Sequence, residues 1–121
     1  MPIDHTSVYV ADLERSKAFY SEALKPLGYS LLFEVEEFLG FGDREMPDFG
    51  VTRRDPVGNG HVAFSAADRA TVDAFHQAAT AAGGTDNGSP GLREHYHPTY
   101  YAAYVKDLDG NNIEVVCHKP E

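Results

Sequence analysis

"HTSVYVADLERSKAFYSEALKPLG", residues 5–28, and "HVAFSAADRATVDAFHQAATAAGG", residues 61–84, are two copies of one pattern. Sliding the chain by 56 residues superposes them, and seven of the 24 aligned positions are identical. The identical pairs are His5 with His61, Ala11 with Ala67, Asp12 with Asp68, Ala18 with Ala74, Phe19 with Phe75, Ala23 with Ala79 and Gly28 with Gly84. Self-similarity at a fixed offset predicts a duplicated module.

Each copy begins as a strand that leads into a capped helix. Residues 5–11 and 61–67 show the short alternation and the aromatic or branched side chains that are typical of strands. Asp12 and Asp68 follow at the position of a helix N-cap, where an aspartate side chain accepts hydrogen bonds from free amides of the first turn. In both copies, therefore, the strand and the helix meet at an aspartate.

The rest of each copy completes a unit of one strand, one helix and three further strands. Residues 13–27 and 69–82 carry apolar side chains at helical spacing, and glycines follow both segments. Three strand-like segments come next in each half, over residues 29–35, 37–42 and 48–53 in the first and over residues 84–87, 100–106 and 111–118 in the second. The polar segment 53–60, which contains glycine and proline, links the two halves.

The composition bounds the class of protein. A chain of 121 residues with 42% hydrophobic residues suits one globular domain, which we expect over residues 1–121, with modules over about 1–54 and about 59–119. The net charge is −9, from 19 acidic and 10 basic residues, which argues against nucleic acid or an anionic membrane as partner. The sequence contains no apolar run of membrane-spanning length and no secretory leader, and the single Cys117 excludes an internal disulfide. These features predict a cytoplasmic protein.

Alternation along the strands predicts which side chains lie on the face that the helices leave open. Val8 and Phe64 are expected beneath the helices. The open face would then carry His5, Ser7, Tyr9, His61, Ala63 and Ser65. We take Ser7, Tyr9 and Ser65 as candidate substrate contacts.

The segment "GNNIEVVCH", residues 110–118, places one carboxylate in an apolar strand. Burying Glu114 costs several kcal/mol unless it is paired, protonated or bound to a cation. Ile113 and Val115 take the core-facing positions, so Glu114 points to the open face with Val116. His5, His61 and Glu114 are thus three candidate ligands on the open side.

These features together make the chain similar to a known family. The duplicated module, with a histidine opening each copy and "DLDGNNIEVV" (107–116) closing the second, resembles the glyoxalase/bleomycin-resistance/dioxygenase family, the vicinal oxygen chelate superfamily. The likeness covers the whole chain. It implies an α+β fold of two tandem βαβββ modules that form cupped mixed β-sheets with helices on the convex face. It also implies that His5, His61 and Glu114 bind one divalent metal ion (iron, zinc, manganese or nickel), which would neutralise the buried carboxylate.

Two functions follow from this resemblance. Two imidazoles and one carboxylate form an open metal site that can polarise a carbonyl or activate a water molecule. The first function is therefore a metal-dependent enzyme with a small oxygen-chelating substrate and lyase, isomerase or ring-cleaving dioxygenase chemistry. A histidine at a strand start is, however, more often a surface residue than a ligand. The alternative is a metal-free binding protein of the bleomycin-resistance type, which sequesters a compound in the same cleft.

One departure from the family bears on the choice of reaction. Glyoxalase I-type lyases carry a further carboxylate or amide ligand on the last strand of the first module. The position in this chain that corresponds to Glu114 is Gly50, which has no side chain. The resemblance therefore predicts little glyoxalase I activity.

A second comparison concerns the ring-cleaving dioxygenases. Their spaced signature is matched in part by His95, Tyr104, Asp107, Gly110 and Glu114, while Ala103 and Leu108 depart from it. By this resemblance His95 and Tyr104 are candidate catalytic residues that would assist deprotonation of a catechol. His95 lies in a polar loop, and His97 or plain surface exposure would explain that histidine as well.

The short link between the modules bears on assembly. In this superfamily a cleft needs two modules side by side, from one chain or from two. Segment 53–60 has only eight residues, which favours consecutive modules packed edge to edge. We therefore expect a homodimer in which His5 of one chain joins His61 and Glu114 of the other.

Overall fold

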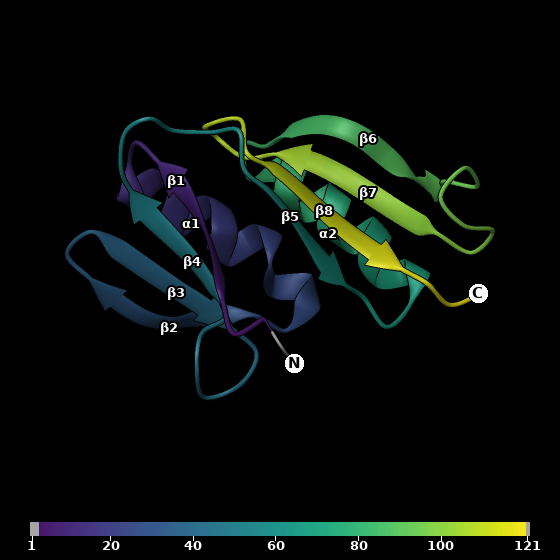
Figure 1. Ribbon diagram of the computed structural model, residues 1–121, viewed down its shortest axis with the longest axis horizontal. Coiled ribbons are helices and arrows are strands. Elements are labelled where there is room, and N and C mark those ends of the chain that lie inside the picture. Colours follow the sequence, from purple (N-terminus) through teal and green to yellow (C-terminus); the bar gives the residue numbers. More distant parts are fainter. Residues whose placement is uncertain (1–2, 121) are drawn as a thin grey trace.

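Within residues 3–120, which the computed structural model describes, the chain forms two four-stranded sheets and two α-helices (Figure 1). The outer bounds expected for the domain, residues 1 and 121, lie outside the described residues. The two sheets lie side by side, and the order of elements in each half is a strand, a helix and three strands. The expected α+β fold of two tandem βαβββ modules is confirmed.

The first sheet has the strand order β1-β4-β3-β2. Its strand β1 pairs with β4 in parallel, and the other pairs are antiparallel, so the sheet is mixed. The elements of this half are β1 (Thr6–Val10), α1 (Leu13–Ala23), the 3₁₀-helix η1 (Lys25–Leu27), β2 (Ser30–Val35), β3 (Phe38–Gly42) and β4 (Phe49–Arg53).

The second sheet repeats this arrangement with the order β5-β8-β7-β6. Strand β5 runs parallel to β8, and the remaining pairs are antiparallel. The elements of this half are β5 (His61–Ser65), α2 (Arg69–Ala81), β6 (Thr85–Leu92), β7 (Tyr101–Lys106) and β8 (Asn112–Cys117).

Both helices begin where the two aspartates predict. The side chain of Asp12 accepts a hydrogen bond from the Arg15 amide at 3.0 Å, and that of Asp68 accepts one from the Thr71 amide at 2.8 Å. Helix α1 is shorter than expected, because Pro26 lacks an amide hydrogen and disfavours α-helical backbone in the residue before it. The chain continues instead as the short 3₁₀-helix η1.

Strand β6 is twice the length expected from the sequence. It spans Thr85–Leu92, whereas the pattern indicated residues 84–87. Gly88, Pro90 and Gly91 interrupt the alternation, and the pairing with β7 shifts register on either side of Gly88. Because β6 is the edge of its sheet, these residues are tolerated there, although they conceal the strand in the sequence.

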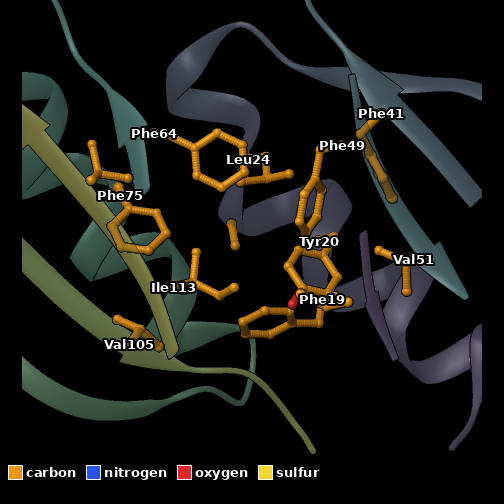
Figure 2. Packing of buried hydrophobic residues seen from close by; sticks show 14 of the residues in the cluster. Phe19, Tyr20, Leu24, Phe41, Phe49, Val51, Phe64, Phe75, Val105 and Ile113 are labelled. Atoms are coloured by element: carbon orange, nitrogen blue, oxygen red, sulfur yellow. The ribbon is translucent and has the colours of Figure 1, made fainter. Parts of the chain in front are cut away.

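One hydrophobic core joins the two halves (Figure 2). The helices α1 and α2 pack against each other and against the strands of the two sheets. The ring of Phe64 from β5 contacts Phe49 from β4 at 5.2 Å between centroids, and Tyr29 at 5.5 Å. The modules are therefore fused through their helix-covered faces, which leaves the opposite face of each sheet open.

A buried polar network, which we call the inter-module clasp, adds to this core. It consists of Tyr20 from α1 and Asp107 and Asn111 from the β7–β8 turn. The Tyr20 hydroxyl donates to Asp107 Oδ2 at 2.5 Å, and Asn111 Nδ2 donates to the same oxygen at 2.9 Å. Asn111 also donates to the carbonyl of Tyr9 in β1 and accepts from the amide of Gly60 before β5. The turn of the second module thus holds the first strand of the first module.

These contacts assign a structural role to two residues of the partial dioxygenase signature. Asp107 is 5% exposed, and its Oδ1 accepts from two further groups in its own turn, the amides of Asp109 and Asn111. Gly110 has φ +92°, in the left-handed region that favours glycine. Within residues 3–120, neither α-helix is long and apolar enough to span a membrane.

Candidate functional site

Glu114 lies in the middle of the open face of the second sheet. On β8 it pairs with Ala63 of β5 on one side and with Tyr104 of β7 on the other. The neighbours Ile113 and Val115 point into the core, as alternation requires. Glu114 itself is only 3% exposed, so its carboxylate needs partners within the protein.

Two side chains supply these partners, one for each oxygen. The Tyr100 hydroxyl donates to Glu114 Oε2 at 2.5 Å, and His61 Nε2 lies 3.3 Å from Glu114 Oε1. Oε2 therefore has a hydrogen-bond donor, whereas Oε1 faces a ring nitrogen of His61.

The orientation of His61 is fixed by a backbone group. Its Nδ1 lies 3.1 Å from the carbonyl oxygen of Asn112, which is only an acceptor, so Nδ1 carries the hydrogen. In the neutral imidazole, Nε2 then presents a lone pair toward Glu114 Oε1. Two acceptors at this distance repel each other unless a proton or a cation lies between them. A backbone carbonyl behind one nitrogen and a carboxylate in front of the other is the arrangement that orients a metal-binding histidine.

Two tyrosines surround the carboxylate. Burial raises the pKa of the Tyr100 hydroxyl, and its hydrogen bond to Glu114 adds to the effect. Burial also raises the pKa of Tyr104, with a further contribution from the negative charge of Glu114. Both phenols are therefore neutral hydrogen-bond donors at physiological pH.

Tyr104 was a predicted site residue, but Tyr100 was not. The structure brings Tyr104 beside Glu114 through the pairing of β7 with β8. Tyr100 precedes β7 and reaches the same carboxylate from the end of the loop that follows β6. In the sequence it stands in a run of aromatic residues, and this run was the one available signal.

A chain of aromatic rings leads from Tyr100 to the surface. The Tyr100 ring lies 5.0 Å from that of Tyr96, which lies 4.2 Å from His95. His95 is exposed and, among the described residues, its side chain makes no hydrogen bond. In the part of the chain that the structure describes, His95 contacts the ring of Tyr96, and no hydrogen bond or ring contact joins it to Tyr104 or Glu114.

His5 does not form one cluster with the other two predicted ligands. It precedes β1 in the first half, where its Nδ1 contacts Asp4 at 2.7 Å. His5 and His61 line one groove of about 740 Å³ between the halves, but Glu114 does not line it. Within residues 3–120, no three His, Cys, Asp or Glu side chains come close enough to hold a metal ion. One chain thus assembles two of the three predicted ligands.

The pairing pattern identifies the residue of the first sheet that corresponds to Glu114. Glu114 pairs with Ala63, and the repeat aligns Ala63 with Ser7, which pairs with Gly50. A Cβ atom at Gly50 would lie 2.6 Å from the ring of Phe38. The space of a carboxylate is therefore taken by an aromatic ring.

The open face of the first sheet is correspondingly apolar. Phe33 pairs with Gly40, and the rings of Phe33 and Phe38 lie 6.2 Å apart above the glycines. Phe33 and Val35 are each 50% exposed. The two halves therefore present different open faces, one apolar and one with a buried carboxylate.

The predicted substrate contacts are divided between these faces. The hydroxyls of Ser7 and Thr52 lie 3.2 Å apart on the first sheet. Tyr9 is 38% exposed on the same face, with the Arg54 guanidinium 5.5 Å from its ring centroid. Ser65 lies on the second sheet, opposite Val116.

Comparisons with known proteins agree on one family. Residues 2–115 match the model of the family described as "Glyoxalase/Bleomycin resistance protein/Dioxygenase superfamily". A protein named "Probable lactoylglutathione lyase", from Vibrio cholerae serotype O1, is 34% identical over 95% of this chain and 89% of its own length.

Solved structures of proteins from this family have the same fold as this chain. A glyoxalase/bleomycin resistance protein from Albidiferax ferrireducens T118 has a TM-score of 0.87 and 32% identity, over 97% of this chain and 99% of its own. A lactoylglutathione lyase from Agrobacterium tumefaciens has a TM-score of 0.70 and 22% identity, over 95% of this chain and 92% of its own. The second likeness concerns the fold alone.

Proposed function

The chain belongs to the glyoxalase/bleomycin resistance protein/dioxygenase superfamily, and from this premise we propose that it is a divalent-metal-dependent enzyme of lyase type. Its substrate would be a small molecule that chelates the metal through two neighbouring oxygen atoms. The name of the Vibrio cholerae relative supports the lyase class. The observation that carries the proposal is the pair formed by His61 and Glu114.

The donor set of this pair fits a metal ion. His61 Nε2 and Glu114 Oε1 are 3.3 Å apart, close to the roughly 3 Å that separates two ligands of one ion. The Asn112 carbonyl keeps the Nε2 lone pair on the side of the carboxylate. When bound, a divalent ion would polarise a substrate oxygen and lower the pKa of a bound water molecule.

The residues around the pair suit proton transfer next to a carbonyl group. Such a reaction needs one group that takes a proton from carbon and another that stabilises the oxygen on which negative charge develops. In our proposal, Glu114 holds the metal ion, and the second of these groups comes from a tyrosine beside it. Tyr104, which is neutral and lies opposite Glu114 on β7, would donate its hydroxyl hydrogen to a substrate oxygen.

The third ligand would come from a second copy of the chain. His5 lies on the first half, and the described residues of one chain offer no complete ligand set. We propose a homodimer in which the open face of each first sheet covers the partner's second sheet. The half-exposed side chains of Phe33 and Val35 support this, because pairing would remove apolar surface from water.

Gly50 limits the reaction. The ring of Phe38 fills the place of a further carboxylate, so we expect weak conversion of hemithioacetals compared with lyases that have this ligand. Ring cleavage of catechols is the less favoured chemistry, because the ring contact of His95 among the described residues is with Tyr96 and not with Tyr104.

A second candidate is a metal-free binding protein of the bleomycin-resistance type. The observation in its favour is that both oxygens of Glu114 already have neighbours, Tyr100 and His61, within the chain. With a proton on His61 Nε2, both oxygens have donors, and the carboxylate then does not require a cation. The same cleft could then hold a compound without turnover.

Metal content separates the two candidates. Wild-type protein purified without chelator and incubated with iron, zinc, manganese or nickel should retain about one ion per chain, whereas His61→Ala should retain none. His76→Ala, which changes a histidine on α2 that contacts Asp86 at 2.8 Å, is the matched control and should bind like wild type. Wild-type protein without metal above background would refute the enzyme proposal and favour the binding protein.

Substrate assays then test the reaction class. Metal-loaded protein would be given a hemithioacetal, and the iron(II) form a catechol with measurement of oxygen uptake. We expect slow or no turnover of the hemithioacetal. Rapid turnover would contradict the inference from Gly50, and rapid oxygen uptake would move the proposal to ring cleavage.

A further inference from the structure

We propose that Tyr100 is a positioning residue that makes Glu114 a one-oxygen ligand. This inference rests on the proposed function and concerns the atoms that Glu114 can offer to a metal. The Tyr100 hydroxyl donates to Oε2 at 2.5 Å, while Oε1 faces His61. The two oxygens of one carboxylate thus have different neighbours.

The hydrogen bond from Tyr100 is strong and is not readily replaced by water. A hydroxyl that donates to a charged oxygen forms one of the stronger hydrogen bonds in proteins. The Glu114 side chain is only 4% exposed, which leaves little room for water molecules as substitute donors to Oε2. An oxygen that loses its partner in such a place is strongly disfavoured.

Tyr100 is itself fixed by the loop that carries it. Its carbonyl accepts from the Arg93 amide at 2.7 Å, and its amide donates to the His97 carbonyl at 3.1 Å. Its ring lies between those of Tyr96 and His118, at 5.0 and 5.2 Å from their centroids. The hydroxyl therefore has a defined position before any ligand binds.

The loop is also tied to the end of the strand that carries Glu114. The hydroxyl of Thr99 donates to the carbonyl of His118, just beyond β8, at 2.7 Å. The donor residue Tyr100 and the acceptor residue Glu114 thus belong to one rigid unit. The hydrogen bond between Tyr100 and Glu114 is therefore held by the surrounding loop and strand, unlike a chance contact made by a flexible side chain.

The consequence is a site with room for a chelating substrate. A carboxylate that binds through both oxygens takes two positions on an ion, and one that binds through a single oxygen takes one. By holding Oε2, Tyr100 would leave a position free for the second oxygen of the substrate. The ligand class favoured by this geometry is a small molecule with two adjacent oxygen donors, such as a hydroxamate.

The test compares Tyr100→Phe with Tyr101→Phe in the full chain. Each variant keeps its ring and loses one phenol that donates to a carboxylate, because Tyr101 donates to Asp73 at 2.7 Å. Tyr101→Phe therefore controls for the general loss of such a bond. The probes are cobalt(II), whose visible absorption reports its ligand set, and acetohydroxamate, whose binding to the cobalt(II) protein is measured by calorimetry.

We expect Tyr100→Phe to keep one cobalt ion per site but to change the absorption spectrum. Acetohydroxamate should bind at least about 10-fold more weakly, because the released Oε2 competes for the position that the ligand needs. Tyr101→Phe should match wild type in both measurements. Equal thermal destabilisation of the two variants would not affect this comparison, since a purely structural role moves the melting temperature but not the spectrum.

Two results overturn the inference, and they are distinguishable. If Tyr100→Phe matches wild type in spectrum and in acetohydroxamate affinity, Tyr100 does not position Glu114, and the proposed metal site stands. If wild-type protein binds no cobalt(II), both the proposed function and this inference are refuted.

Discussion

Replacing Asn111 by alanine tests whether the inter-module clasp holds the two halves together. The Asn111 side chain is fully buried and makes three hydrogen bonds: to the Gly60 amide at 2.9 Å, the Tyr9 carbonyl at 3.1 Å and Asp107 Oδ2 at 2.9 Å. Alanine removes all three and leaves their partners without a replacement.

The magnitude follows from these groups. Each lost hydrogen bond contributes about 1 kcal/mol, and each polar group left unpaired in the interior adds about 1–3 kcal/mol. Allowing for partial access of water to the Gly60 and Tyr9 groups, we expect Asn111→Ala to lower the free energy of unfolding by about 3–5 kcal/mol. That is a large fraction of the roughly 5–15 kcal/mol that stabilises a typical domain.

The measurement is urea denaturation at fixed protein concentration, followed by circular dichroism. Asn87→Ala is the matched control, because Asn87 makes one exposed side-chain bond, to Asn112 Oδ1 at 3.2 Å. It should change stability by less than about 0.5 kcal/mol. An Asn111→Ala protein within about 1 kcal/mol of wild type would refute the reasoning.

Three further predictions concern assembly, pH and packing. A mixture of His5→Ala and Glu114→Ala chains should regain one intact metal site per heterodimer, measured as bound metal. The reason is that the proposed cleft takes His5 from one chain and the other two ligands from its partner. A strict monomer in light scattering would contradict this prediction. The pKa of Tyr20 is raised above the value of about 10 in an unfolded chain, mainly by burial and then by the negative charge of Asp107. Stability should therefore be full below about pH 10 and fall as the pH rises beyond it, and Tyr20→Phe should make that alkaline loss shallower in urea titrations; an unchanged slope would argue against it. Gly50→Ala should cost about 1–3 kcal/mol in the same assay, because its Cβ would lie 2.6 Å from the Phe38 ring, and a neutral effect would show that the ring moves aside freely.

The fold was largely predictable because its signals are local and occur twice. Asp12 and Asp68 mark helix starts through bonds to amides three residues away, and this contact leaves a sequence pattern. Strand β6 was underestimated because its residues have low strand propensity, and its pairing with β7 is set by tertiary structure. The 3₁₀-helix η1 could have been inferred from Pro26.

The site was less predictable because its contacts cross the sheet. The open-face position of Glu114 followed from alternation, but its partner Tyr100 lies 14 residues earlier, in a loop without regular spacing. The roles of His5 and His95 depend on what surrounds them in the assembled protein, which no local pattern encodes. Nothing in the sequence indicated that Asp107, which matches the partial dioxygenase signature, is a buried partner of Tyr20, because that contact joins residues far apart in the chain.

The clasp also orders events during synthesis of the chain. The carbonyl of Tyr9 accepts a hydrogen bond from Asn111, which is 102 residues later in the chain. The hydroxyl of Tyr20 donates to Asp107, which is 87 residues later. When the first module has left the ribosome, the residues that complete its hydrogen bonds have therefore not yet been synthesised. The nascent amino-terminal half emerges with unfinished polar contacts and with Phe33 and Val35 still facing water. These contacts can form only after the β7–β8 turn has emerged from the ribosome, so the first module completes its polar contacts late in synthesis of the chain.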